Sequence, residues 1–383
     1  SALFLVRLPE RNAALSVPFR DQEAGQLPKL PLSRRFRSRL KHRDGARFKA
    51  LEQAARNLML EPWEPLVLQP PCHLALDLAA LHPDGRDHDL TVRLNEEVIN
   101  AGGTATTVQR VQILDQNGGS VLAFGDLSEI TGISIVGGDG DQSVVIEASS
   151  FEVHAPFTVE FDGGAGTDSI TFDTDKSTNW TIDDTNAGSG TDGFVSVVFE
   201  DTEWARGAAG NDDSFTLTAD GHMSGGIDGG DAGFDVLTLS GGIYDTVKYQ
   251  AVDETSGYVH RDGDTLYFTG LEPIYDNTDA ANLIIDISPT DGTLTATTAT
   301  LDVGITMDFV IDGPAFESWE FDAPTNSLTI TSETLLLNPV VDLTIEGFSS
   351  NFTGDLIVQT ESITVDSNVS IGSSGAGELS SVL

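Results

Sequence analysis

The chain has 383 residues, enough for two or three domains or for one long repeat array. Its formal net charge of -40 is uneven: residues 1–100 carry 15 Lys/Arg against 13 Asp/Glu, and residues 101–383 carry 5 against 47. So acidic a body repels nucleic acid and anionic membranes, and we predict no nucleic-acid partner. No apolar run is long enough for a transmembrane segment.

The N-terminal quarter divides into two expected parts. Residues 1–61 are basic and form a leader that we expect to be disordered or partly helical, with a short helix over 48–61. A targeting or anionic-surface role for the leader is the alternative. Residues 62–89 contain four closely spaced prolines and predict an extended linker.

From residue 90 onward the apolar period changes to two. Strand-length apolar or alternating runs such as 108–114, 143–147 and 327–331 are separated by Gly, Asp and Asn. The sequence therefore predicts an all-β fold after a leader and a linker. Because the chain does not begin with Met and ends within this β pattern, we expect it to be part of a longer protein.

Glycine-rich turns begin near residues 137, 163, 187, 207 and 229. Steps of 20–26 residues suit the coils of a three-faced, right-handed parallel β-helix or β-solenoid with Gly/Asp-rich turns. Each coil would bury alternate side chains against its neighbours alone. At about 4.8 Å per coil, about twelve coils would make a rod roughly 55–60 Å long.

One of these turns has a recognisable motif. Residues 163–171 read Gly-Gly-Ala-Gly-Thr-Asp-Ser-Ile-Thr and fit the G-G-x-G-x-D-x-U-x nonapeptide, in which U is a large apolar residue. This resembles the calcium-binding repeat of secreted repeats-in-toxin proteins. Weaker copies follow, so we predict Ca²⁺ as the cofactor. The candidate metal ligands are Asp168 and Asp192, followed by Asp212, Asp235, Asp139 and Asp141.

The same turns have a structural interpretation. Glycine at positive φ and aspartate in local Asx-type hydrogen bonds build tight turns without any metal. Stacked carboxylates a few ångströms apart would repel each other without a cation, and that argument favours calcium. The copies are degenerate, however, and do not guarantee six oxygen ligands.

Signatures of catalysis are scarce in the sequence. The only cysteine is Cys72, so no intrachain disulfide can form, and no zinc spacing, G-x-S-x-G or P-loop motif is present. We therefore predict no catalytic residue. The tryptophans could form a sugar-stacking set, although such isolated rings more often serve packing; they are Trp63, Trp180, Trp204 and Trp319.

The segment from Asn179 to Asn277 carries a family likeness. Its successive motifs, including Gly-Asn-Asp-Asp-Ser-Phe at 210–215 and Ser-Gly-Gly-Ile-Asp-Gly-Gly at 224–230, resemble modules of giant repetitive haemagglutinin/adhesin-like bacterial surface proteins. Those proteins often carry an N-terminal L-E-P-R-x-L-L sequence, and here Leu60-Glu61-Pro62 is followed by Trp63. Residues 326–372 are similar to filamentous-haemagglutinin β-helix coils.

The resemblance implies a secreted or surface-anchored protein that functions in adhesion or biofilm contact. We expect a β-solenoid with calcium-type turns over 90–290 and haemagglutinin-like coils over 291–383. The expected partner is a cell-surface or matrix ligand such as a polysaccharide. A β-helix lyase or epimerase is the enzymatic alternative, and a passive spacer for an adhesive tip elsewhere is the third.

Overall fold

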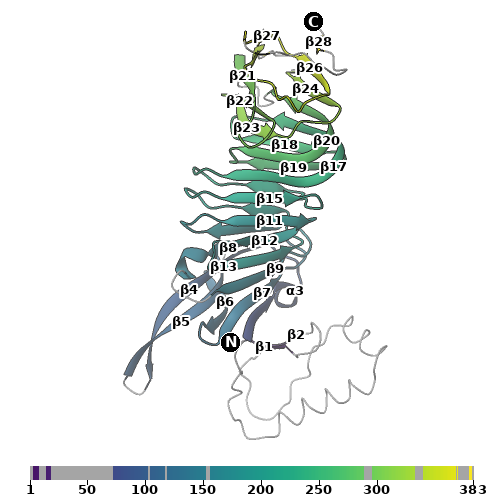
Figure 1. Cartoon of the computed structure of the whole chain (residues 1–383). Coiled ribbons are helices and arrows are strands. Elements are labelled where there is room, and N and C mark those ends of the chain that lie inside the picture. Colours follow the sequence, from purple (N-terminus) through teal and green to yellow (C-terminus); the bar gives the residue numbers. More distant parts are fainter. Residues whose placement is uncertain are drawn as a thin grey trace, which may run out of the picture.

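The computed structural model describes residues 3–7, 14–18, 72–101, 104–116, 119–151, 156–288, 296–332, 340–367, 369 and 379–381. It confirms the all-β prediction: parallel strands stack into one elongated solenoid (Figure 1). Helical structure among these residues is confined to α3 (Leu78–Leu81) and the 3₁₀ turn η1 (Ala148–Phe151). In the described part of the chain no helix is long and apolar enough to cross a membrane.

Four parallel ladders form the walls of the solenoid. The first contains β3 (Cys72–Asp77), β7 (Ile130–Val136), β9 (Phe157–Asp162) and β13 (Val195–Glu200). The second contains β4 (His88–Ala101), β8 (Gln142–Glu147), β10 (Ser169–Asp173), β14 (Trp204–Arg206), β16 (Gly226–Asp228) and β19 (Asp264–Thr269).

The third and fourth ladders continue the stack toward the C-terminal end. The third contains β11 (Asn179–Asp184), β15 (Ser214–Thr218), β17 (Val236–Ala251), β20 (Ile274–Asp286), β24 (Ser327–Thr331), β26 (Asp355–Gln359) and β28 (Leu379–Ser381), and β20 also pairs with β23 (Phe316–Phe321). The fourth contains β21 (Ala296–Asp302), β25 (Val340–Ile345) and β27 (Ser362–Val365).

Antiparallel strands interrupt this parallel pattern. They are β5 (Thr104–Asp115), β6 (Ser120–Asp126), β12 (Ala187–Thr191), β18 (Ser256–Arg261) and β22 (Phe309–Gly313). The coils consequently differ in length: the register steps by 26 residues from Val144 to Ile170 but by 35 from Ile170 to Ala205. The two-residue alternation of apolar side chains in the sequence cannot reveal such hairpins, because antiparallel and parallel strands show the same alternation.

Three expectations need correction. The predicted linker 62–89 contains β3, α3 and the start of β4, so the solenoid already begins at Cys72. The segment 187–191, expected as a turn between coils, is strand β12. Following the ladders gives about nine layers and a stack about 40 Å long at about 4.8 Å per layer, shorter than expected.

The leader is described only in part. β1 (Leu3–Arg7) and β2 (Ala14–Pro18) pair as antiparallel strands where we expected disorder or a helix. The predicted helix over 48–61 and the four closely spaced prolines at 62, 65, 70 and 71 lie outside the described residues.

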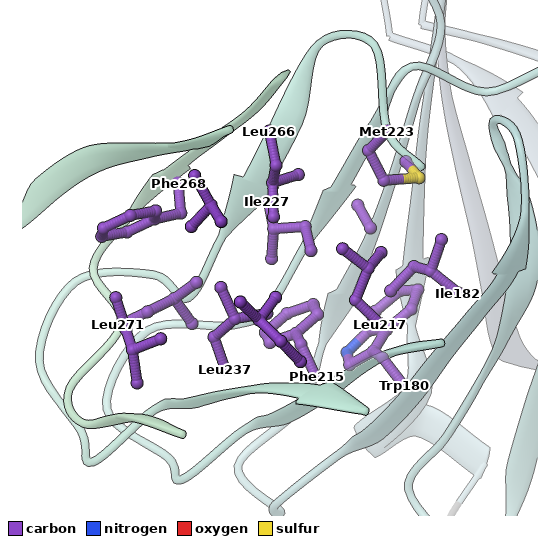
Figure 2. Packing of buried hydrophobic residues seen from close by; sticks show 14 of the residues in the cluster. Trp180, Ile182, Phe215, Leu217, Met223, Ile227, Leu237, Leu266, Phe268 and Leu271 are labelled. Atoms are coloured by element: carbon purple, nitrogen blue, oxygen red, sulfur yellow. The ribbon is translucent and has the colours of Figure 1, made fainter. Parts of the chain in front are cut away.

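The interior is filled by side chains that stack in register from coil to coil. Trp180, Phe215, Leu237, Ile274 and Trp319 occupy equivalent inward positions on successive strands of the third ladder and its β23 neighbour, and each is essentially fully buried. The Trp180 and Phe215 rings are parallel, with centroids 5.6 Å apart. Figure 2 shows Trp180, Phe215 and Leu237 of this column among other buried residues of the core. Burial of this column ties each layer to the next.

Close packing against the Trp180 ring requires glycine at position 190 of β12. An added Cβ at Gly190 would lie 2.6 Å from the Trp180 ring. Glycine is therefore required there for the indole to pack against the β12 backbone.

We predict that Phe215→Ala lowers the free energy of unfolding by about 3–5 kcal/mol, because it removes a ring from the stacked interior. Chemical denaturation followed by circular dichroism measures this change. The control is Val198→Ala on β13, whose side chain is 52% exposed and whose loss should change stability by about 0.5 kcal/mol or less. Equal effects of the two substitutions would contradict the inward position of Phe215.

Candidate functional site: the acidic turns between coils

The six predicted ligands lie in three separate places. Asp192 lies in the hairpin turn between β12 and β13. The turns from the first to the second ladder hold Asp139, Asp141 and Asp168, and the turns from the second to the third ladder hold Asp212 and Asp235. The Gly/Asp turns therefore form two stacks on different corners of the solenoid, and the hairpin residue belongs to neither.

Residues at the N-terminal ends of the second-ladder strands form a vertical column of hydrogen bonds. Gln142, Asp168 and Glu203 precede the second-ladder positions Ser143, Ser169 and Trp204, which are in register, and we call these three residues the first acidic column. The Gln142 N–H donates to Asp168 Oδ1 at 2.6 Å. The Asp168 N–H donates in turn to Glu203 Oε2 at 2.6 Å. Each acidic side chain thus accepts the backbone N–H of the preceding layer.

The third ladder repeats this arrangement. Thr178, Asp213 and Asp235 form the second acidic column, in which the Thr178 N–H donates to Asp213 Oδ1 at 2.8 Å and the Asp213 N–H donates to Asp235 Oδ1 at 2.7 Å. Asp213 also accepts from the Thr178 hydroxyl, from Asn211 Nδ2 and from the Ala208 N–H. The column therefore satisfies backbone donors at the point where each strand begins.

Sequence reasoning missed Asp213 and chose Asp212. A signal was available in the strand that follows: Asp213-Ser-Phe-Thr-Leu matches Asp168-Ser-Ile-Thr-Phe when the two strands are aligned on their apolar positions. Asp212 Oδ1 instead accepts the Phe234 N–H at 3.0 Å on an exposed part of the turn.

The glycines of the motif make room for the carboxylates. An added Cβ at Gly163 would lie 2.7 Å from Asp168 Oδ2 and would clash with the carbonyl oxygen of Asp201 in the next coil. At Gly207 it would clash with Asp213 Oδ2. The Gly-then-Asp spacing is thus explained by packing between coils, whether or not a cation is present.

Burial raises the pKa of the column carboxyls. Asp168 is fully buried, and this raises its pKa to about 7; the hydrogen bond from Gln142 opposes the shift, and the charges of Glu203, Asp141 and Asp162 add to it. Burial likewise raises the pKa of Asp235 to about 6, and it raises the pKa of Asp213. Asp168 and Asp235 therefore take up protons near neutral pH, which relieves repulsion from the acidic groups stacked beside them.

The remaining candidates make local contacts. Asp192 Oδ1 accepts the N–H groups of Phe194 and Val195 at 2.9 and 2.8 Å, an Asx-type turn. Asp141 Oδ1 accepts the Thr167 N–H at 2.8 Å. Within the residues that the structure describes, no three His, Cys, Asp or Glu side chains converge as a metal site.

Two carboxylate oxygens nevertheless lack a partner. Asp168 Oδ2 and Asp192 Oδ2 are buried, and neither accepts a hydrogen bond. Hard oxygen donors of this kind suit Ca²⁺, and backbone carbonyls of the same turns could complete its shell. Asp168 and Asp192 therefore remain the first candidates for a cation, one in each of two separate turns.

The described tryptophans divide between core and surface. Trp180 and Trp319 are buried in the interior column, whereas Trp204 lies half-buried on the outer face of β14. Trp63 lies outside the described residues. The set is thus not a single sugar-stacking group, and only Trp204 of the described three is placed to meet a ligand.

Comparison with protein-family models, with curated proteins and with solved structures finds no match for this chain.

The buried Asp168 carboxyl predicts a pH dependence of stability. Its pKa is raised from 3.8 to about 7, so the folded protein holds this proton more tightly than the unfolded chain. The resulting stabilisation is fully present below about pH 4 and is lost as the pH rises through about 7, on the order of 4 kcal/mol in total.

We predict that Asp168→Asn flattens the fall in stability between about pH 5 and pH 8, because an amide keeps an oxygen for the Gln142 N–H and cannot ionise. Chemical denaturation at both pH values, with a chelator present, measures the slope. Asp84→Asn, at an exposed carboxylate, is the matched control. If Asp168→Asn and Asp84→Asn leave equal slopes, Asp168 is not the titrating group.

Proposed function

We propose that this chain is a non-catalytic structural and adhesive segment of a large secreted or surface-anchored bacterial repeat protein. The observation that carries the proposal is the unbroken stack from β3 to β28, in which each layer contacts only its neighbours. Such an architecture extends a surface outward by repetition, and elongated scaffolds need this property. We propose that the protein functions in the extracellular space or at the bacterial cell surface, in adhesion and biofilm contact.

The charge of the body supports this setting. Residues 101–383 carry 47 acidic and 5 basic residues, so the rod repels other copies of itself and other polyanions. Such a surface stays soluble and gains stability wherever divalent cations are abundant, as they are outside cells. We propose that Ca²⁺ binds the Gly/Asp turns, with Asp168 and Asp192 as its first ligands.

A polysaccharide-modifying enzyme is the second candidate. On the outer face, Lys248 of β17 lies in register with His260 of β18, and Lys248 Nζ forms an ion pair with Asp286 at 2.9 Å. Lyase or epimerase chemistry on an acidic sugar needs several cationic groups in one cleft, and this cluster supplies a single lysine beside the histidine. The scaffold is therefore the function that we favour.

We predict that Ca²⁺ raises the unfolding midpoint more than Mg²⁺ does at equal ionic strength, because loosely arranged carboxylate and carbonyl ligands suit the larger ion. Binding to the folded form alone adds about 2.7 kcal/mol at a hundredfold excess over the dissociation constant. Thermal denaturation with each ion measures the difference.

The double variant Asp168→Asn/Asp192→Asn should lose much of the calcium gain. The control Asp84→Asn/Asp175→Asn removes two exposed carboxylates, and with them the same formal charge. Equal responses of the two double variants, together with equal effects of Ca²⁺ and Mg²⁺, would show that the cation only screens charge.

A further inference from the structure

The outer face of the second ladder carries a row of aromatic side chains. Trp204 of β14 is in register with Gly226 of β16, which lies beside Tyr267 of β19, and Tyr267 is in register with Tyr258 of β18. The alternate residues of these strands, Ala205, Ile227, Phe268 and Val259, are buried in the core. The three rings are therefore held outward by a rigid sheet; we call Trp204, Tyr267 and Tyr258 the aromatic row.

The rings of this row form a continuous surface. Trp204 and Tyr267 lie edge to face with centroids 6.0 Å apart, and Tyr267 and Tyr258 have centroids 5.2 Å apart. Gly226 makes this approach possible, because an added Cβ there would lie 3.1 Å from the Trp204 ring and 3.2 Å from the Tyr267 ring. Three half-buried aromatic rings thus span neighbouring strands without a side chain between them.

Polar groups flank the aromatic row on both sides. Arg206 lies 5.0 Å from the centroid of the Trp204 ring and forms a long ion pair with Asp228, 3.8 Å from Nη1 to Oδ2. On the other side lie Lys248, paired with Asp286, and His260, which shares a 2.9 Å hydrogen bond with Thr265. Hydrogen-bond donors and acceptors therefore border an apolar strip, as specific binding sites require.

Charge decides which class of ligand suits the strip. Both cations beside the row already face a carboxylate, so the strip itself is close to neutral. The surrounding body is strongly acidic and repels polyanions. A neutral ligand is consequently favoured over a uronate polymer or a nucleic acid.

We propose that the aromatic row binds a neutral polysaccharide. One face of a pyranose ring presents C–H groups, whose positive edges are attracted to the negative face of an aromatic ring. The sugar hydroxyls reach the flanking carboxylates, the arginine and the threonine. A flat, extended strip accommodates a chain of sugars better than a single small molecule. This inference rests on the proposed scaffold function and gives the matrix ligand a chemical class.

The test titrates the full chain with soluble neutral hexasaccharides (cellohexaose, laminarihexaose and mannohexaose) and with polygalacturonate, by calorimetry and by tryptophan fluorescence. The matched variants are Trp204→Ala, Tyr258→Ala and Trp204→Phe. The control is Phe124→Ala, which removes a 50% exposed ring from β6 outside the aromatic row. Circular dichroism establishes that each variant is folded.

We expect at least one neutral hexasaccharide to bind the parent chain and to change the fluorescence. Its affinity should fall about tenfold or more in Trp204→Ala and in Tyr258→Ala, remain within a few-fold in Trp204→Phe, and stay unchanged in Phe124→Ala. Absence of binding to all three neutral sugars, binding only to polygalacturonate, or unchanged affinity in folded Trp204→Ala would overturn the proposal.

The same samples separate this inference from the proposed function. If the aromatic row fails to bind sugar, the scaffold can still act as a passive spacer. Lyase activity on polygalacturonate would instead overturn the non-catalytic function. It would be detected by the absorbance of the unsaturated uronate ends that it releases. The two failures therefore give different signals.

Discussion

In-register stacking of parallel strands is the constraint on which the rest of this structure depends. Every position on one coil meets the equivalent position on the next, about 4.8 Å away, so a residue must be compatible with its counterparts above and below. Apolar residues meet this condition by forming the interior column from Trp180 to Trp319. At the corners the same condition applies to polar groups, and glycine and acidic residues satisfy it together. The glycine leaves space, and the neighbouring carboxyl accepts a backbone N–H from the coil before it.

This arrangement gives the acidic turns a structural role in holding neighbouring coils together. A stack of carboxylates would be repulsive if all were ionised, but burial raises the pKa of Asp168 and Asp235 into the neutral range, and each accepts a backbone hydrogen bond. Protonation thus neutralises part of these columns, and under the proposed calcium binding Ca²⁺ would compete with protons for the same carboxylates. The charge state of the acidic turns therefore affects the stability of the solenoid. That charge state depends on the acidity of the whole body and on the geometry of its corners.

Sequence patterns predicted the fold class because alternation of apolar residues survives in nearly every strand, and the glycine motif at 163–168 marks a real corner. The patterns failed where the register between paired strands determines which residue enters a column or faces outward. Asp213 and Asp212 are adjacent, and only alignment on the following strand shows that Asp213 enters the column. Residues 187–191 resemble a corner in composition, yet Gly190 makes room for the Trp180 ring and Gly188 for the β11 backbone at Thr181. Likewise, Trp204 and Trp180 differ only in which side of a strand they occupy, so the outer aromatic row could not be seen before the strands were paired.

The register itself can be tested with paired cysteines. Ser143 of β8 and Ser169 of β10 point outward at equivalent positions of adjacent coils. In a Cys72→Ser background, Ser143→Cys with Ser169→Cys should form a disulfide readily, because a separation of about 5 Å between their Cα atoms lies within the range of such bonds. Ser143→Cys with Thr171→Cys, displaced by two residues and separated by about 8 Å, should not. Efficient cross-linking of the first pair alone is the result that this account predicts, and preferential cross-linking of the second pair would contradict it.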